Sequence, residues 1–297
     1  MKKNILIVIA GPTAVGKTDF SIRLAKHFNT EIISADSRQV FKEMTIGTAK
    51  PSQQQLKEVK HHFINSHSIT QTMNAGIYEK ECLPVIDALF EKHNVVILTG
   101  GTGLYMDVII NGIDNLPPAD AEVRKRLEEE LANTSLELVA ERLKNIDGLT
   151  FSKIDIKNPK RLLRALEVFE ITGKPYSQFL EKKKPHRNFT PILFCLNKER
   201  EELYSQINLR VDKMIEDGLE QEVRSLIAFR NHNALQTVGY KEFFDFFDEK
   251  LSIEQTVELI KKNTRNYAKR QLTWFRRYEE MNWIEGDEFE KVIESIK

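Results

Sequence analysis

A glycine-rich loop near the start of the chain carries the residues with the clearest chemical meaning. It follows the apolar run Ile5–Ala10, precedes an amphipathic stretch and has the pattern G-x-x-x-x-G-K-[ST]. In this strand–loop–helix setting the backbone N–H groups face an anion, Lys17 adds a positive charge and the Thr18 hydroxyl can ligate Mg²⁺. The loop therefore predicts a binding site for a di- or triphosphate. The predicted phosphate-binding residues are Gly11, Pro12, Thr13, Ala14, Val15, Gly16, Lys17 and Thr18.

A carboxylate, Asp36, follows the second apolar run, Glu31–Ala35. At the carboxyl end of a parallel strand it would share a rim with the phosphate loop, as a general base or as an outer-sphere ligand of a metal. An Asp in this position can equally cap the next turn through its own backbone. Arg38 and Gln39 beside it offer paired donors that suit phosphates and base edges.

A second glycine-rich turn, Gly100–Gly103, follows the apolar run Val95–Thr99. In ordinary phosphate-loop nucleoside triphosphatases a strand of this kind ends in an acid that supports the metal. No acid stands here, which argues against nucleotide hydrolysis. The turn itself indicates either close approach of a ligand or merely a tight bend.

The elements that must position these residues alternate between strand and helix. The three apolar runs and a fourth, Pro191–Leu196, are typical of buried parallel strands. We therefore predict an α/β fold with a parallel sheet flanked by helices, like that of P-loop NTPases. A break at Asn115–Pro118 and mostly helical patterns after it predict a helical insertion at 114–188, with 1–113 and 189–297 forming the catalytic body. Capping-box spacings at Thr134/Glu137 and Ser252/Gln255 predict two helix starts, and Asn158-Pro159 predicts another helix that Gly173 would end.

The composition is that of a globular protein, with 297 residues, 41% of them hydrophobic, and 44 basic against 44 acidic residues. This excludes collagen-like and disordered classes, and any polyanion must be bound by a local patch. No apolar run near the start is long enough to span a bilayer, and the two cysteines lack a zinc or disulfide spacing. His61-His62 has no partner at metal spacing. We expect a cytoplasmic protein without a membrane partner, and a monomer.

A basic stripe near the end of the chain predicts contact with nucleic acid. The segment 261–277 holds seven Lys and Arg residues and no acid, whereas a merely solvated face usually carries acids as well. On a helix, four of these cations share one face and an apolar face lies opposite. The cations are Lys262, Arg265, Lys269 and Arg276, and the opposite residues are Ile260, Tyr267 and Trp274.

A second basic cluster lies in the first turns of the helix predicted to begin at Pro159. Cations there oppose the helix dipole by roughly 0.3–1 kcal/mol each, so local stability does not explain Lys160, Arg161 and Arg164, whereas an anionic ligand would. Leu162 and Leu163 between them suit a core.

Several motifs together make the chain resemble the tRNA dimethylallyltransferase (IPP transferase) family. They occur in order over nearly the whole chain, and the second is far more specific than the phosphate loop. One departure is Phe41, where the family often has Tyr. The motifs are GPTAVGKT (11–18), DSRQVFKEMTIGTAKP (36–51), HH (61–62), GGTGLY (100–105), KRLLRALEV (160–168), VGY (238–240) and AKRQLTWF (268–275).

The resemblance implies transfer of a dimethylallyl group from its diphosphate to N6 of adenosine 37 in tRNAs that read codons beginning with U. The phosphate loop would hold the leaving diphosphate, with Mg²⁺ on Thr18 as cofactor, which accounts for the missing acid. Arg210 matches a diphosphate-contacting arginine, and Asp36 matches the base that takes the amine proton. Lys17, Thr18, Asp36 and Arg210 are thus the implied catalytic residues.

The tRNA partner would be bound through its anticodon stem-loop, which we expect the insertion and the body to clasp. The target base must be splayed out of the loop before chemistry. Together with the basic stripe, the implied tRNA-binding residues are Asp36, Ser37, Arg38, Gln39, Thr102, Arg124, Lys160, Arg161, Leu162, Leu163, Arg164, Arg265, Lys269 and Arg276.

Two alternatives stay open on the residues alone. A P-loop kinase, or a prenyltransferase acting on free adenine nucleotides, explains the phosphate loop and Asp36 but leaves the basic stripe without a role. A nucleic-acid-binding nucleotide switch explains the stripe, but it lacks the strand-end acid and predicts hydrolysis of ATP or GTP.

Overall fold

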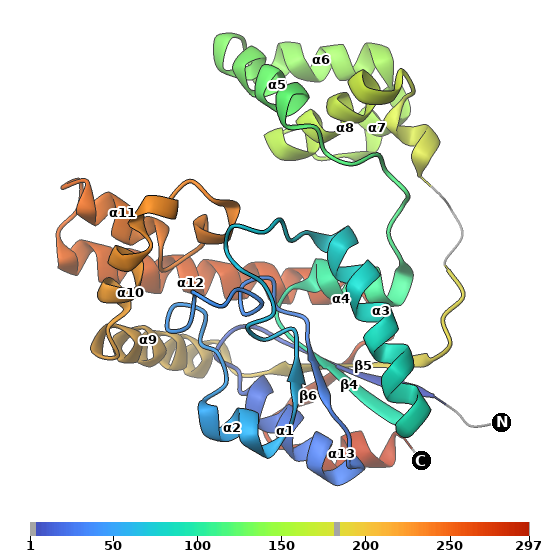
Figure 1. Ribbon diagram of the computed structural model, residues 1–297, viewed down its shortest axis with the longest axis vertical. Coiled ribbons are helices and arrows are strands. Elements are labelled where there is room, and N and C mark those ends of the chain that lie inside the picture. Colours follow the sequence, from blue (N-terminus) through green and yellow to red (C-terminus); the bar gives the residue numbers. More distant parts are fainter. Residues whose placement is uncertain (1–3, 181–184, 297) are drawn as a thin grey trace. The chain divides into compact units, whose positions relative to one another are not determined.

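A computed structural model of the chain describes residues 4–180 and 185–296 and divides into two compact units (Figure 1). Unit 1 comprises Met1–Asn111 and His186–Lys297, and unit 2 comprises Gly112–Pro185. Unit 2 covers nearly the range 114–188 in which the sequence places a helical insertion. Each unit has a hydrophobic core of its own, so each is described by itself.

Unit 1 is built on a six-stranded sheet in the order β3-β2-β4-β1-β5-β6, and every neighbouring pair is parallel. The four predicted strands are confirmed, although the second is shorter than its apolar run. Two edge strands were missed, because their few residues include polar side chains and form no apolar run. The strands are β1 Ile5–Ala10, β2 Ile32–Ser34, β3 His61–His62, β4 Val95–Thr99, β5 Thr190–Asn197 and β6 Asn282–Glu285.

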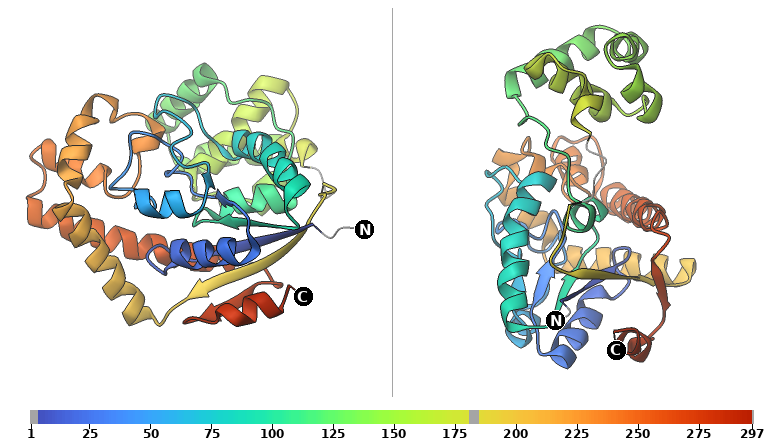
Figure 2. Two further views of the ribbon diagram at one scale, coloured as in Figure 1. Left: turned by 60° about the horizontal axis from the view of Figure 1, so that its bottom comes forward. Right: turned by 90° about the vertical axis from the view of Figure 1, so that its right-hand side faces the viewer.

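Helices cover both faces of this sheet (Figure 2), as predicted for the α/β class. The longest, α12, begins with the predicted capping box of Ser252 and Gln255. The α-helices of unit 1 are α1 Lys17–Phe28, α2 Gln53–Glu58, α3 Ala75–Lys92, α4 Gly103–Asn111, α9 Arg200–Glu216, α10 Leu219–Ser225, α11 Lys241–Phe247, α12 Ile253–Phe275 and α13 Phe289–Glu294; short 3₁₀ turns are η2 Ile227–Phe229 and η3 Asn233–Leu235.

The central strand β1 links two hydrophobic cores. Its side chains alternate, as in any strand, so that Leu6 and Val8 lie in a core with residues of α3 and α4. Ile7 and Ile9 lie in the other core, with residues of α1 and α13. Since β1, β2, β4 and β5 are parallel, the segments that follow them emerge at one edge of the sheet, which is where the phosphate loop, Asp36 and the second glycine-rich turn meet.

No helix within 4–180 and 185–296 combines the length and the apolar character needed to cross a bilayer. Both cysteines, Cys82 and Cys195, are free thiols buried inside unit 1.

Unit 2 is helical. As predicted, Asn158 caps the helix that begins at Pro159, and Gly173 ends it with a φ of 67°. The capping box predicted at Thr134 is wrong: Ser135 caps the next helix instead, because the Thr134 hydroxyl donates to the Glu130 carbonyl and ends the preceding helix. The elements are α5 Ala121–Asn133, α6 Leu136–Ile146, α7 Gly148–Lys153, α8 Pro159–Thr172 and the 3₁₀ turn η1 Tyr176–Phe179.

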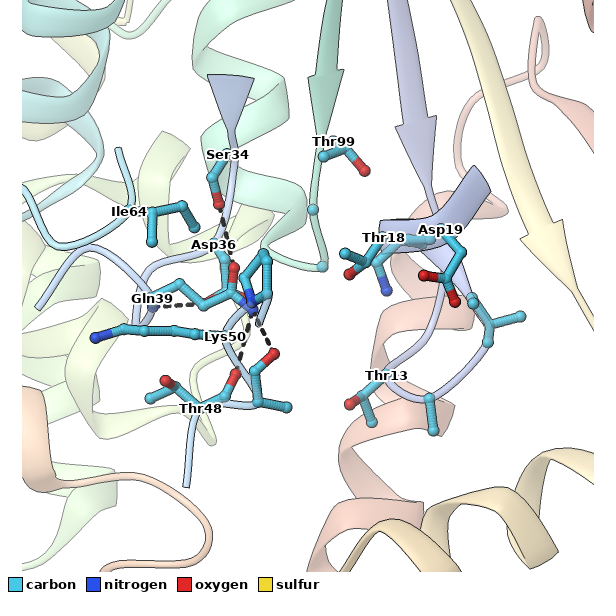
Figure 3. A pocket seen from close by; sticks show the side chains of 18 of the residues that line it. Thr13, Thr18, Asp19, Ser34, Asp36, Gln39, Thr48, Lys50, Ile64 and Thr99 are labelled. Atoms are coloured by element: carbon cyan, nitrogen blue, oxygen red, sulfur yellow. Dashed lines mark hydrogen bonds between the residues drawn. The ribbon is translucent and has the colours of Figure 1, made fainter. Parts of the chain in front are cut away.

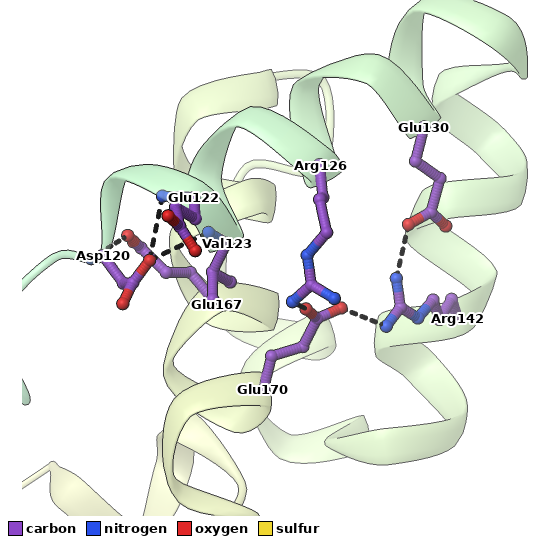
Figure 4. Close-up of polar contacts among 8 residues, drawn as sticks. All are labelled: Asp120, Glu122, Val123, Arg126, Glu130, Arg142, Glu167 and Glu170. Atoms are coloured by element: carbon purple, nitrogen blue, oxygen red, sulfur yellow. Dashed lines mark hydrogen bonds and ion pairs between the residues drawn. The ribbon is translucent and has the colours of Figure 1, made fainter.

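Two carboxylates of α8 tie the helices of unit 2 together (Figure 4). Glu167 is fully buried and pairs with Arg124 and Arg164. It also accepts the Asp120 N–H at 3.1 Å, a contact that Figure 4 draws. Burial raises the pKa of Glu167, but hydrogen bonds from the two arginines outweigh burial and the net effect is a lowered pKa. One turn further, Glu170 bridges arginines of α5 and α6, so these ion pairs connect α5, α6 and α8.

Candidate active site

The phosphate loop connects β1 to α1 in the predicted manner. At Gly11, φ is 148° and a Cβ would lie 2.8 Å from the Leu196 carbonyl oxygen, so the loop's first position requires glycine. Gly16 caps α1 with a left-handed φ of 103°. The Lys17 ammonium donates to the carbonyls of Gly11 at 2.9 Å and Pro12 at 2.7 Å. Its charge therefore lies against the first residues of the phosphate loop.

A cavity of about 290 Å³ opens on the phosphate loop; we call it the loop cavity. Figure 3 shows Thr13, Thr18 and Asp19 on one side of it, facing Asp36, Gln39 and Lys50 on the other. The remaining lining residues come from the strand ends, from the loop segments around 48–51 and 64, and from α2, α9 and α12. They include Ser34, Thr48, Ala49, Pro51, Gln55, His61, Ile64, Thr99, Gly100, Gly101, Arg210, Tyr267 and Gln271.

Positive charge is concentrated at the loop cavity. Arg210, from α9, lines it and donates to the Thr13 hydroxyl at 3.4 Å. Burial, and then the charge of Arg210, lower the pKa of Lys17 to about 8, although Asp36 acts in the opposite sense. Burial also lowers the pKa of Arg210. Two cations that are both disfavoured by burial form a site that an anion would stabilise.

Asp36 both caps a turn and faces the cavity, so the two interpretations of this residue are compatible. Its Oδ1 accepts the backbone N–H groups of Arg38 at 2.8 Å and Gln39 at 3.1 Å. Its Oδ2 makes no hydrogen bond with any residue that the structure describes. One oxygen therefore fixes the turn and the other is left to accept a proton from a ligand.

A second cavity, of about 460 Å³, adjoins the loop cavity; we call it the outer cavity. The two share Asp36, Arg210 and Tyr267 among their lining residues. Tyr267, from α12, was predicted to be on the buried face of its helix, but it is only half-buried because it lies at this junction. Polar and apolar side chains both line the rest of the outer cavity. The polar ones include Ser37, Arg38, Gln236, Thr237, Lys241, Glu242, Asn263, Thr264 and Arg270, and the apolar ones include Val211, Met214, Val238 and Ile260.

The second glycine-rich turn is explained by packing within the protein. A Cβ at Gly100 would lie 2.2 Å from the Ala35 carbonyl oxygen, and one at Gly103 would lie 2.2 Å from the Trp274 ring. Thr102 between them accepts the Ser37 N–H at 3.0 Å. The turn thus binds the segment that carries Asp36, and its glycines are required by neighbouring chain segments whatever ligand approaches.

Glu222 of α10 organises the segment 44–51, a role that the sequence did not reveal. Its carboxylate accepts the backbone N–H groups of Thr45, Ile46 and Gly47 at 2.8–3.0 Å, and the Tyr240 hydroxyl at 2.6 Å. Thr48 and Ala49, which follow, line both cavities. The glycine and tyrosine motifs mark this contact, because a Cβ at Gly47 would lie 2.5 Å from the Tyr240 ring.

We expect Glu222→Ala to lower both stability and activity, because four donors lose their acceptor. The expected loss is about 1–3 kcal/mol in the free energy of unfolding, measured by urea denaturation. Glu220→Ala is the matched control, since Glu220 is on the same helix but forms only a surface pair with Arg224 at 2.7 Å. Equal unfolding midpoints for the two variants would contradict this role of Glu222.

The other predicted residues around Asp36 are engaged within the protein. Arg38 lines the outer cavity and donates to the Asn233 carbonyl at 2.9 Å, and burial lowers its pKa. The Gln39 amide donates to the carbonyls of Thr48 and Ala49, both at 3.2 Å, so it holds the loop in place. Contact of these residues with tRNA stays a prediction.

The stripe on α12 is only partly as predicted. Lys262, Lys269 and Arg276 are exposed, whereas Arg265 is half-buried and donates to Asn208 of α9 at 2.6 Å. Lys269 and Arg276 line a third cavity, between α9 and α12, together with Lys198 and Arg200. Two of the three exposed stripe cations therefore lie in a groove with further cations and one acid, Glu199, whereas Lys262 lies outside it.

The predicted tRNA-binding residues of unit 2 fall into three groups that differ in their exposure and partners. Lys160 and Arg161 are exposed. Leu162 and Leu163 are 0% and 4% exposed in the core of the unit, so including them in a surface was wrong. The charge of Arg164 does have a local explanation, contrary to our expectation, because it pairs with Oε2 of Glu167 at 2.8 Å. Arg124 pairs with the same oxygen.

Comparison with known proteins gives consistent matches. A sequence model of the family described as IPP transferase matches residues 39–278. A tRNA dimethylallyltransferase of Cytophaga hutchinsonii is 49% identical over 292 residues, covering 98% of this chain and 96% of the relative.

Two solved structures are similar over most of the chain. The tRNA isopentenylpyrophosphate transferase of Bacillus halodurans is 35% identical, with a TM-score of 0.71 over 99% of this chain and 94% of that one. A eukaryotic dimethylallyltransferase described as acting on tRNA is 28% identical, with a TM-score of 0.81 over 97% of this chain and 75% of that one.

Proposed function

The chain belongs to the IPP transferase family, and from this premise we propose that it transfers a dimethylallyl group from dimethylallyl diphosphate to N6 of adenosine 37 in tRNAs reading codons that begin with U. The product would be N6-isopentenyladenosine, with diphosphate released. We further propose that it acts in the cytoplasm as a monomer, without a membrane partner.

The observation that carries this proposal is the meeting of two cavities at Asp36. The loop cavity has the phosphate-binding residues and the cations Lys17 and Arg210, which suit a diphosphate. The outer cavity has backbone and side-chain groups that suit a base edge, such as Asn263 and Arg270. A donor in one and an acceptor in the other would react beside a carboxylate that has one unused oxygen.

The chain's own residues account for the main demands of the reaction. The adenine amine attacks the allylic carbon as the C–O bond to diphosphate breaks, and Oδ2 of Asp36 takes the amine proton. Such an amine is a poor nucleophile because its lone pair is delocalised into the ring, so a positioned base helps. Lys17, Arg210 and the loop N–H groups stabilise the charge that develops on the leaving diphosphate.

The magnesium ion that the family implies would be held by Thr18. Its hydroxyl lines the loop cavity and has no hydrogen-bond partner among the described residues. Mg²⁺ keeps several waters and takes one or two protein ligands besides substrate phosphates, so a single free hydroxyl fits it. When bound, the ion supplies further stabilisation of the leaving diphosphate.

We expect the exposed cations of α12 to bind tRNA phosphates. Lys269→Ala and Arg276→Ala should each weaken tRNA binding and reduce by about one the slope of log affinity against log salt concentration. Filter binding at several salt concentrations measures both. Lys291→Ala removes an exposed cation from α13, where it pairs with Glu288 at 3.1 Å, and should leave the slope unchanged. If all three variants behave alike, this groove does not bind tRNA.

The proposed function is tested with radiolabelled dimethylallyl diphosphate, Mg²⁺ and three acceptors: a tRNA reading UNN codons, the same tRNA with G at position 37, and free AMP. Label on the first acceptor alone supports the proposal. Label on AMP would replace it with a free-nucleotide prenyltransferase. Release of phosphate from ATP or GTP in a parallel assay would favour a nucleotide switch.

A further inference from the structure

We infer that Gln271 is a positioning residue that fixes the phosphate loop relative to the segment carrying Asp36. Gln271 lies on α12 and is only 5% exposed, and it belongs neither to the phosphate loop nor to the basic stripe. The inference rests on the proposed function, because it assigns the residue a part in aligning the two substrates.

The amide of Gln271 makes one hydrogen bond to each side of the loop cavity. Its Oε1 accepts the Thr13 N–H of the phosphate loop at 2.9 Å. Its Nε2 donates to the Gly101 carbonyl of the second glycine-rich turn at 2.8 Å. The two segments follow β1 and β4, which pair in the sheet as far as the bond from the Gly100 N–H to the Ile9 carbonyl at 3.2 Å. Gln271 joins them beyond that point, where the chain has left the sheet.

The hydrogen bond to Gly101 connects Gln271 with the segment that carries Asp36. The next residue, Thr102, donates its N–H to the Ala35 carbonyl at 3.2 Å and accepts the Ser37 N–H at 3.0 Å. Ala35 and Ser37 flank Asp36. A shift of the Gly101–Thr102 segment would therefore move the base relative to the bound diphosphate.

Close packing restricts the position of the Gln271 amide. A Cβ at Gly101 would be only 2.2 Å from its Nε2, so the turn is shaped around the amide. The Thr13 N–H is occupied by Oε1 and needs no ligand, which distinguishes it from the loop amides that are free to bind phosphate. These contacts point to alignment as the role of Gln271, since small errors in the geometry of reacting groups have large effects on rate.

Gln271→Glu is the sharpest test, because it keeps the shape and the acceptor for Thr13 but replaces the donor to Gly101 by a carboxylate oxygen. We expect kcat at pH 8 to fall on the order of tenfold or more, with little change in the KM for dimethylallyl diphosphate. A buried carboxyl beside a carbonyl has a raised pKa and can donate once protonated. The ratio of variant to wild-type kcat should therefore rise as the pH is lowered.

Gln271→Met removes both hydrogen bonds at similar volume and should also weaken binding of inorganic diphosphate, measured by calorimetry. Gly101→Ala, which displaces the amide, should lower kcat as Gln271→Glu does. Asn266→Asp makes the same amide-to-acid change at an exposed position of α12 and serves as the matched control.

If Gln271 had a purely structural role, we would expect different results. If kcat, corrected for the folded fraction, equals that of wild type in Gln271→Glu and Gly101→Ala, or if the kcat ratio does not change with pH, the inference is wrong. Failure of the proposed function gives a different result, because wild-type protein would then transfer no label to tRNA. The affinity of Gln271→Met for inorganic diphosphate could still be compared with that of wild type.

Discussion

Replacing Asp36 with Asn should lower kcat for transfer by about 10²–10⁴-fold while both substrates still bind. The Asn side chain retains an oxygen that can accept the N–H groups of Arg38 and Gln39, which hold the turn at 2.8 Å and 3.1 Å. It has no basic oxygen to take the amine proton. Single-turnover transfer of the radiolabelled allyl group to tRNA measures the rate of the chemical step directly.

Two further variants separate the roles of the two Asp36 oxygens. Asp36→Ala loses the turn contacts as well as the base, so it should also lose affinity for tRNA, whereas Asp36→Asn should keep it. Asp87→Asn changes an exposed carboxylate of α3 and should behave as wild type. Transfer by Asp36→Asn within threefold of the wild-type rate would show that the carboxylate caps the turn and does nothing more.

The parts of the site that the sequence predicted are those encoded by neighbouring residues. The phosphate loop lies within a few residues of β1 and α1, and its glycines, lysine and threonine have fixed geometric roles. Asp36 and the second glycine-rich turn follow apolar runs, and parallel strands bring such ends together. The helix bounds at Pro159 and Gly173 likewise depend on local backbone preferences.

The parts that could not be predicted depend on contacts between distant segments. Gln271 meets Thr13 across 258 positions, and Glu222 meets Thr45 across 177. Neither residue has a local pattern that distinguishes it from an ordinary polar side chain on a helix. The error at Arg164 has a different cause, because its partner Glu167 lies only one turn away on α8 and also pairs with Arg124 of α5. The helix-dipole argument takes account of the charge of Arg164 but not of the carboxylate that pairs with it.

Replacing Lys17 with Met should lower kcat by about 10²–10³-fold, because one of the charges that stabilise the leaving diphosphate is lost. Lys26→Met is the matched control, since Lys26 is exposed on the same helix and pairs with Glu58 at 2.5 Å. A loss confined to the KM for the allyl diphosphate, with kcat unchanged, would instead mean that Lys17 binds the substrate and its transition state equally well.

The pH dependence of diphosphate binding gives an independent test of Lys17. Burial and the charge of Arg210 lower its pKa to about 8, so the ammonium loses its proton as the pH rises through that value. A bound anion favours the charged form, so binding above pH 8 must take up a proton and the affinity must fall. Lys50 also lines the loop cavity, and burial lowers its pKa to about 8 as well. Calorimetry with inorganic diphosphate from pH 7 to pH 9.5 should therefore show a steeper fall in wild-type protein than in Lys17→Met, which lacks the Lys17 proton. Parallel curves for the two proteins would show that the proton is not on Lys17, and the stabilising charge would then have to be assigned to Arg210 or Lys50.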